Sequence, residues 1–107
     1  MKILIADDHT IVREGLKRIL KKFTEIKEIE ETNNGIEALQ MIEANHYDFV
    51  VLDISLPGIS GLEVLKTLQL QQNKTRILVL SMHPEEQFAI RAFKYGALGY
   101  VTKDRAG

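Results

Sequence analysis

The sequence predicts an α/β fold, a doubly wound parallel sheet of five strands with helices packed on it. Short apolar runs alternate along the chain with segments whose apolar residues recur at the spacing of a helix face. Strands separated by helices pair in parallel through right-handed crossovers. The chain has 107 residues, the size of one domain. Five strands can be identified, but only four helices.

The predicted strands differ in how deeply they should be buried. Phe49–Leu52 is wholly apolar, as in strands buried on both faces of a sheet. Ile26–Thr32 mixes charged and apolar residues, which predicts an edge strand. The remaining strands are predicted at Ile3–Ala6, Ile77–Leu80 and Leu98–Val101.

Helical spacing of apolar residues predicts four helices between these strands. Pro84 is expected in the first turn of the last helix, a position that suits proline, and Gly96 is expected to end it. The helices are predicted at Ile11–Phe23, Ala38–Ile42, Leu62–Leu68 and Phe88–Phe93.

Composition narrows the possible classes of function. The formal net charge of −1 argues against nucleic-acid binding by this segment, because such binding usually needs a basic surface. The absence of cysteine excludes disulfides and thiolate metal sites. No apolar run approaches the roughly 20 residues of a membrane span, and no signal peptide is readable. These features predict a cytoplasmic protein with no membrane partner.

Polar residues follow four of the predicted strands. The first strand runs into Asp7 and Asp8, the third into Asp53, the fourth into Ser81 and the fifth into Lys103. In an open parallel sheet the ligand site lies at the carboxyl ends of the strands. We therefore expect these side chains to converge on one edge of the sheet.

Three neighbouring carboxylates need a proton or a cation among them. Oxygen ligands without a nearby histidine or cysteine favour a hard cation, and Mg²⁺ in particular. A carboxylate beside Mg²⁺ and a lysine can attack a phosphoryl group to give an aspartyl phosphate. Taken singly, each residue has a plainer interpretation: Asp8 could cap a helix, Ser81 could be a loop hydroxyl and Lys103 a surface lysine.

The chain carries four motifs at Ile5–His9, Val51–Gly61, Leu80–His83 and Gly96–Lys103. Together they resemble the receiver domain of two-component response regulators. The resemblance covers Met1 to about Asp104 and is closest to the NarL/FixJ-like receivers that precede a LuxR-type helix-turn-helix output domain. It implies a flavodoxin-like sheet with strand order 2-1-3-4-5.

The resemblance implies roles for the acidic residues. Asp53 would accept the phosphoryl group. Asp8, Asp53 and the backbone carbonyl of Ser55 would bind Mg²⁺ directly, and Asp7 would act mainly through a bound water. A sensor histidine kinase would supply the phosphate, so that the domain would be a switch that catalyses only its own phosphorylation and dephosphorylation.

The resemblance also implies how the switch works. Lys103 would contact the phosphoryl group, Ser81 would move to hydrogen-bond it, and Tyr100 would turn inward behind it. The face formed by the fourth helix and the fifth strand would then change its affinity for partners. His9 and His83 are interpreted as loop or surface residues.

Two features depart from the family pattern. Many receivers have a proline in a cis bond after the lysine, but here Asp104 follows Lys103, which leaves the geometry of this loop open. Receivers also carry a fifth helix, and only four residues follow Lys103 here. We expect residues 1–107 to be a C-terminally truncated receiver that dimerises through the uncovered sheet face or is poorly stable. DNA binding would belong to the missing part.

The fold class allows three alternative functions. An aspartyl-phosphate phosphatase or phosphotransferase would need a substrate cap and usually a second aspartate where Ser55 stands. A nucleotide-binding module would need a glycine-rich loop in place of Asp7–Thr10. A stand-alone receiver that signals by protein docking alone remains open.

Overall fold

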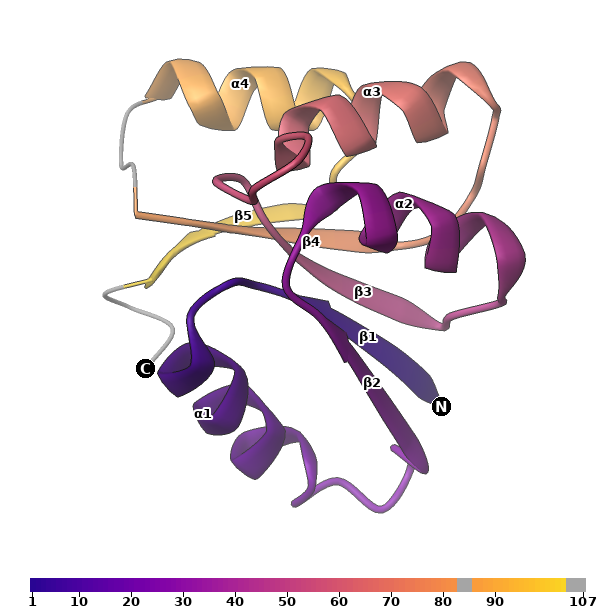
Figure 1. The fold of residues 1–107 in the computed structure, drawn as a ribbon, viewed down its shortest axis with the longest axis vertical. Coiled ribbons are helices and arrows are strands. Elements are labelled where there is room, and N and C mark those ends of the chain that lie inside the picture. Colours follow the sequence, from indigo (N-terminus) through magenta and orange to yellow (C-terminus); the bar gives the residue numbers. More distant parts are fainter. Residues whose placement is uncertain (83–85, 104–107) are drawn as a thin grey trace.

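Five parallel strands form one sheet in the order β2-β1-β3-β4-β5, as the computed structural model shows for residues 1–82 and 86–103 (Figure 1). The predicted strand order and parallel pairing are thus confirmed. The predicted edge strand, β2, lies at one edge. The strands are β1 (Lys2–Ala6), β2 (Glu28–Thr32), β3 (Phe49–Asp53), β4 (Ile77–Ser81) and β5 (Gly99–Thr102).

Four helices connect the strands. Side chains cap the amino-terminal ends of α2 and α3. Asn34 accepts a hydrogen bond from the backbone N–H of Glu37, and Ser60 accepts one from that of Glu63. None of the described helices combines the length and the apolar character of a membrane span. The helices are α1 (Thr10–Leu20), α2 (Gly35–Ala44), α3 (Gly61–Leu70) and α4 (Glu86–Lys94).

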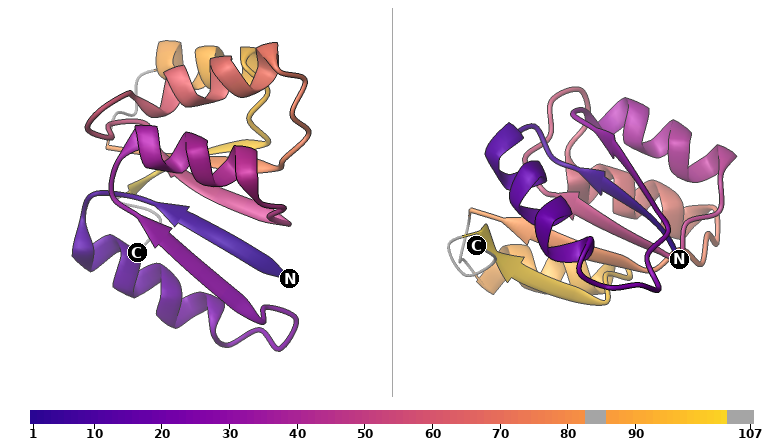
Figure 2. Two further views of the ribbon diagram at one scale, coloured as in Figure 1. Left: turned by 45° about the vertical axis from the view of Figure 1, so that its right-hand side comes forward. Right: turned by 90° about the horizontal axis from the view of Figure 1, so that it is seen from below.

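The central strands are buried on both faces. Leu4, Val50 and Ile77 are paired neighbours in the sheet and belong to one core cluster with residues of α2 and α3. Side chains of a strand alternate between faces, so Ile5 and Val51 point to the opposite side, where α1 lies. Helices α2, α3 and α4 cover one face, and α1 is the one described helix on the other (Figure 2).

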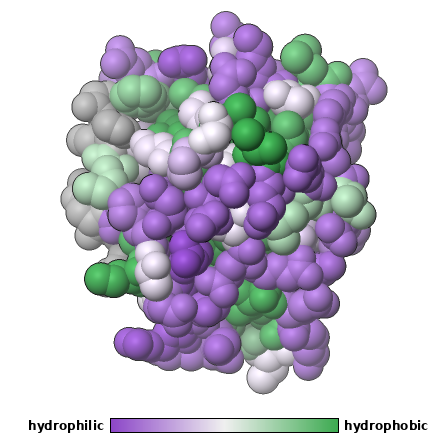
Figure 3. Space-filling model, in the orientation of Figure 1, coloured by the Kyte–Doolittle hydropathy of each residue, from purple (hydrophilic) through white to green (hydrophobic). Residues whose placement is uncertain are grey.

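The α1 face is less completely packed. No residue of α1 is fully buried, and every residue of β5 is only half-buried. Exposed apolar side chains include Ile11, near the start of α1, and Phe23, just beyond its end. In the view of Figure 3, apolar residues form separate small patches among hydrophilic ones. Dimerisation through the α1 face stays a prediction.

The boundaries of the elements differ from those predicted by a few residues. Helix α1 ends at Leu20, although the apolar spacing extended to Phe23. Gly96 follows α4 with a φ of +95°, a conformation that favours glycine at a helix end. The predictions for Pro84 in the first turn of the last helix and for the loop after Lys103 lie outside the described residues.

Helix α3 starts in direct contact with the strand end that carries Asp53. The backbone N–H of Gly61 donates to the carbonyl of Ile54, 2.9 Å away. A Cβ at Gly61 would lie 2.8 Å from the Cα of Ile54 and would overlap the carbonyl oxygen of Asp53. Only glycine therefore permits this approach.

We expect Gly61→Ala to lower the free energy of unfolding by about 1–3 kcal/mol, because the added methyl group forces two backbones apart. Gly15→Ala is the matched control: no atom lies within 4 Å of its Cβ position in the middle of α1. That change should raise the free energy of unfolding by about 0.5–1 kcal/mol through helix propensity. Urea denaturation measures both, and equal effects of the two variants would contradict this account.

Candidate functional site

The two buried carboxylates of the site are placed by neighbouring central strands. Asp53 is the last residue of β3. Asp7 directly follows β1, and its backbone N–H still pairs with the carbonyl of Thr32 on β2. Both aspartates have 0% of their surface exposed. The expected convergence of these strand ends therefore brings two acidic side chains into the interior.

Lys103 lies between these carboxylates. Its Nζ is 2.9 Å from Oδ2 of Asp53 and 3.2 Å from Oδ2 of Asp7. The Lys103 side chain is only 6% exposed. Oδ2 of Asp7 forms an ion pair with Nζ of Lys103, but it accepts no hydrogen bond from any donor. The prediction that β5 delivers a lysine to the aspartates is confirmed.

Burial raises the pKa of Asp53 above its ordinary value, and the negative charge of Asp7 adds to the effect. Two contacts oppose it by favouring the ionised form. The backbone N–H of Ser55 donates to Oδ1 of Asp53 at 3.0 Å, and the ammonium of Lys103 donates to Oδ2. The carboxylate thus remains costly to ionise despite two good hydrogen bonds.

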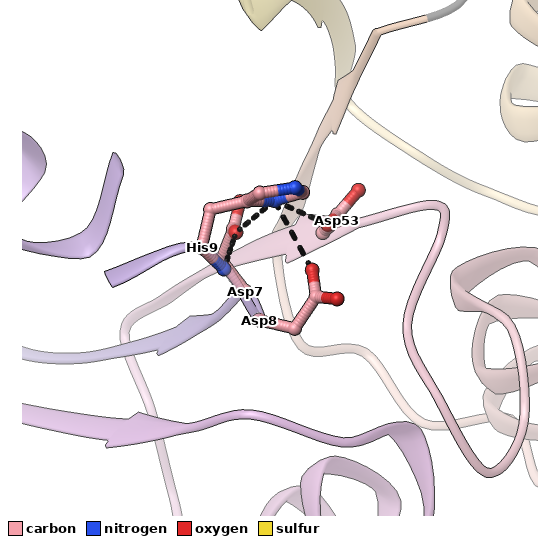
Figure 4. A group of neighbouring side chains, drawn as sticks. All are labelled: Asp7, Asp8, His9 and Asp53. Atoms are coloured by element: carbon pink, nitrogen blue, oxygen red, sulfur yellow. Dashed lines mark hydrogen bonds and ion pairs between the residues drawn. The ribbon is translucent and has the colours of Figure 1, made fainter. Parts of the chain in front are cut away.

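Asp8 and His9 complete the cluster from its exposed side. The Asp8 side chain is 36% exposed and the His9 side chain 49% exposed. Nδ1 of His9 lies 3.1 Å from Oδ1 of Asp7 and 3.1 Å from Oδ1 of Asp8. Figure 4 shows the ring turned toward all three aspartates. One potential ligand atom from each of Asp7, Asp8, His9 and Asp53 lies within 4.8 Å of the others.

The interpretation of His9 as a loop or surface residue is confirmed, because His9 lies outside the helices and strands and is exposed. Its backbone is the N-cap of α1 and its ring is half exposed, but Nδ1 belongs to the acidic cluster. The expectation of oxygen ligands with no histidine nearby was wrong, because this nitrogen lies near the carboxylate oxygens. The sequence places His9 next to Asp8, but the direction of its ring depends on side-chain torsions that the spacing of residues does not reveal.

The two predicted switch residues are on β4 and β5, the two strands that follow β3 in the sheet. Ser81 is the last residue of β4, is fully buried and is paired with Thr102 of β5. Tyr100 is opposite Val79 in the same pair of strands, is half-buried and packs against the core. Ser81 is thus on the strand next to the one that carries Asp53, and Tyr100 is one strand further along the sheet.

Sequence reasoning missed Arg13. Its Nη1 donates to the backbone carbonyl of Asp7 at 2.6 Å, and its Nε pairs with Glu31 of β2 at 3.1 Å. Lys17, one helical turn further on, also binds Glu31 and lowers the pKa of that carboxyl group. These contacts attach α1 to the strand ends. The four-residue spacing of Arg13 and Lys17, which places both on one helix face, was the sequence feature that could have predicted these contacts.

A cavity of about 570 Å³ lies away from this cluster, at the amino-terminal edge of the sheet. Its lining includes Met1, Tyr47, Asp48 and Arg76, and none of the acidic cluster. The functional site is therefore identified by the raised pKa of Asp53 and by the charged side chains around it, and not by the volume of a cavity.

The residues of the cluster fit a divalent cation. Three carboxylates face a single ammonium group, so the charges of the side chains do not balance. The buried Oδ2 of Asp7 accepts no hydrogen bond and has only its ion pair with Lys103, so a lone pair is available for a cation. Carboxylate oxygens with access to water are the ligands that Mg²⁺ prefers.

Comparison with known proteins agrees with this geometry. The response regulator receiver domain family matches residues 3–106 of the chain. The chain belongs to this family. The receiver is 35% identical over 106 residues to response regulator UvrY of Escherichia coli O6:H1, which covers 99% of this chain and 49% of UvrY. The receiver thus spans about half the length of the curated relatives it matches.

Solved structures support the same assignment. A LuxR-family two-component response regulator from Aurantimonas sp. SI85-9A1 aligns with a TM-score of 0.86 at 37% identity, covering 95% of this chain and 73% of that one. The regulator TrrA of Thermotoga maritima, solved in complex with Mg²⁺–BeF, aligns with a TM-score of 0.82 at 35% identity, covering 95% and 85%. The flavodoxin-like fold and the NarL/FixJ-like character of this signalling domain are confirmed.

The raised pKa of Asp53 predicts a pH-dependent cost of folding. Below the pKa of the unfolded chain, roughly 4, the carboxyl group is protonated in both states and costs nothing. As the pH rises through the higher folded pKa, the folded chain must ionise a buried acid, and stability is lost. Without divalent cations, Asp53→Asn should raise the free energy of unfolding at pH 7 by about 1 kcal/mol.

Asp48→Asn is the matched control, because the backbone N–H of Lys2 lowers the pKa of Asp48. Its ionised form is favoured by folding, so this variant should be less stable than the parent at pH 7, the opposite direction. Urea denaturation at several pH values measures both variants. A loss of stability in Asp53→Asn that persists at neutral pH would contradict the assigned cause.

Proposed function

We propose that Asp53 accepts a phosphoryl group and that the domain is the phosphorylation-dependent switch of a two-component system. One observation carries the proposal: a buried carboxylate with a raised pKa lies 2.9 Å from a buried lysine, inside a cluster of acids. An oxygen of Asp53 attacks phosphorus and forms a P–O bond. The P–N bond of a phosphohistidine breaks, and its electrons and a proton pass to the imidazole of the donor.

Asp7, Asp8 and Asp53, with the backbone carbonyl of Ser55, are proposed to hold Mg²⁺. Oδ2 of Asp7, which accepts no hydrogen bond, and the partly exposed Asp8 would supply oxygen atoms to the cation. When bound, Mg²⁺ would neutralise charge on the phosphoryl oxygens. The structure of TrrA with Mg²⁺–BeF, a relative at 35% identity, supports this proposal.

Lys103 supplies a second positive charge in this proposal, in addition to that of Mg²⁺. Its ammonium group is held by Asp53 and Asp7, so it is already positioned beside the acceptor. It can donate a hydrogen bond to a phosphoryl oxygen and offset the added charge. The same contacts keep it from solvent, which strengthens its electrostatic effect.

Ser81 and Tyr100 are proposed to report phosphorylation to the surface. A phosphorylated Asp53 adds charge and hydrogen-bond acceptors next to the end of β4, where the Ser81 hydroxyl can donate. Tyr100 lies on the adjoining strand and packs against the core, so its position responds to changes beside it. The surface of α4 and β5 is thus the proposed output face.

The partners proposed for the whole protein follow from its family. A sensor histidine kinase would be the phosphate donor, and DNA would be bound only by a C-terminal output domain, a proposal supported by the similarity to a DNA-binding response regulator of the LuxR family from Staphylococcus aureus. The alternative is a stand-alone receiver that signals by docking on other proteins or on a second copy. In both cases, residues 1–107 act as one phosphoacceptor domain.

We expect incubation with a small phosphodonor and Mg²⁺ to add one phosphoryl group, detected by intact mass and removed by mild base. The group should be absent in Asp53→Asn and after chelation of the metal, because the nucleophile or the charge neutralisation is then lost.

Asp48→Asn is the matched control, since Asp48 precedes the other end of β3. It should be phosphorylated like the parent chain. Phosphorylation that persists in Asp53→Asn would place the acceptor elsewhere and overturn the proposed function.

Ser81→Ala should separate phosphorylation from its structural consequence. The variant should still gain the phosphoryl group, but the amide chemical shifts of β5 should change much less on phosphorylation, because the hydroxyl donor is gone. Two-dimensional NMR of the phosphorylated and unphosphorylated forms measures this. Ser60→Ala, which removes the cap of α3, should lower stability by about 1 kcal/mol and leave the shift changes intact. Full shift changes in Ser81→Ala would argue against its switch role.

A further inference from the structure

We propose that His9 is a direct ligand of the divalent cation and that it makes this receiver bind Mn²⁺ more tightly than its aspartates alone would. The inference rests on the proposed cation site of the preceding section and adds a nitrogen donor to it. It concerns metal selectivity, which the proposed phosphorylation does not require.

The His9 ring is directed into the cluster although its backbone position suggests another use. His9 is the N-cap residue of α1, where side chains usually accept a hydrogen bond from the helix. Its side chain makes no such bond. Instead, Nδ1 lies 3.1 Å from a carboxylate oxygen of Asp7, 3.1 Å from one of Asp8 and 3.9 Å from Oδ2 of Asp53.

Nδ1 cannot satisfy all of its neighbours. Nζ of Lys103 lies 2.8 Å away and is only a donor, so that contact needs the lone pair of Nδ1. The oxygens of Asp7 and Asp8 are acceptors, so they need a proton on the same nitrogen. A cation bound by the lone pair and by both carboxylates would satisfy the nitrogen and the oxygens together.

A second observation points independently to a ligand at this place. The Asp7 side chain is completely buried, and its Oδ2 accepts no hydrogen bond, although it forms an ion pair with Lys103 at 3.2 Å. Buried polar atoms without partners are rare and often mark an ion or a water that belongs to the site. Among the residues that the structure describes, the side chains of Asp7, Asp8, His9 and Asp53 are placed to coordinate such an ion.

The nitrogen of His9 determines which cations bind more tightly. Imidazole is a good ligand for transition metals, whereas Mg²⁺ prefers oxygen and retains its water. A nitrogen from His9 should therefore strengthen binding of Mn²⁺ and leave that of Mg²⁺ nearly unchanged. Since an imidazole nitrogen has one lone pair, Lys103 and the cation cannot use Nδ1 at the same time.

The test compares the parent chain with His9→Ser. Serine is a preferred N-cap residue, so α1 keeps its start, and its short side chain lacks the nitrogen. Electron paramagnetic resonance of free Mn²⁺ measures Mn²⁺ affinity, and competition by Mg²⁺ measures that of Mg²⁺. We expect His9→Ser to weaken Mn²⁺ binding by about tenfold and to leave Mg²⁺ binding within about twofold. Electron spin echo modulation from ¹⁵N-histidine should be present in the parent chain and absent in the variant.

His46→Ser is the matched control, because His46 is 89% exposed and its nearest acidic partner is Asp48. It should leave both affinities and the nitrogen modulation unchanged. Unchanged Mn²⁺ affinity in His9→Ser, or no nitrogen modulation in the parent chain, would overturn the inference. If Mg²⁺ still supported phosphorylation of Asp53 in that case, the proposed function would stand. Failure of the parent chain to bind either cation would overturn both.

Discussion

The repulsion among Asp7, Asp8 and Asp53, offset by the single ammonium of Lys103, is the interaction on which the site depends. Two of the three carboxylates are fully buried, where separation from water makes each charge costly. Folding brings these charges together through the pairing of central strands, and the hydrophobic core supplies the free energy to hold them there. The result is a site prepared to gain positive charge.

The same charges link stability to function. A buried carboxylate that lowers the free energy of unfolding is also one that a bound cation or phosphorylation can stabilise, since both change its electrostatic surroundings. Lys103 limits the cost without removing it, and Ser55 adds a backbone hydrogen bond to the acceptor. Binding a cation should therefore stabilise the folded chain as well as assist the chemistry.

The packing around the strand ends gives the charges their precise positions. Gly61 allows the start of α3 to touch the backbone at Asp53, and Arg13 attaches α1 to the carbonyl of Asp7. These contacts come from opposite faces of the sheet. The acceptor is thus held by rigid elements, while Asp8 and His9 remain partly exposed and accessible to an ion and its water.

The sequence by itself determined the alternation of strands and helices, the parallel sheet and the strand ends that carry Asp53, Ser81 and Lys103, because hydrophobic periodicity and local order record these features. Tertiary structure alone decided which groups meet. Ion pairs such as Lys103 with Asp7 join residues 96 positions apart, and their geometry depends on register and side-chain torsions. The position of His9 shows the limit most clearly: the sequence indicated a loop or surface residue, and only the fold directed its nitrogen into the acidic cluster.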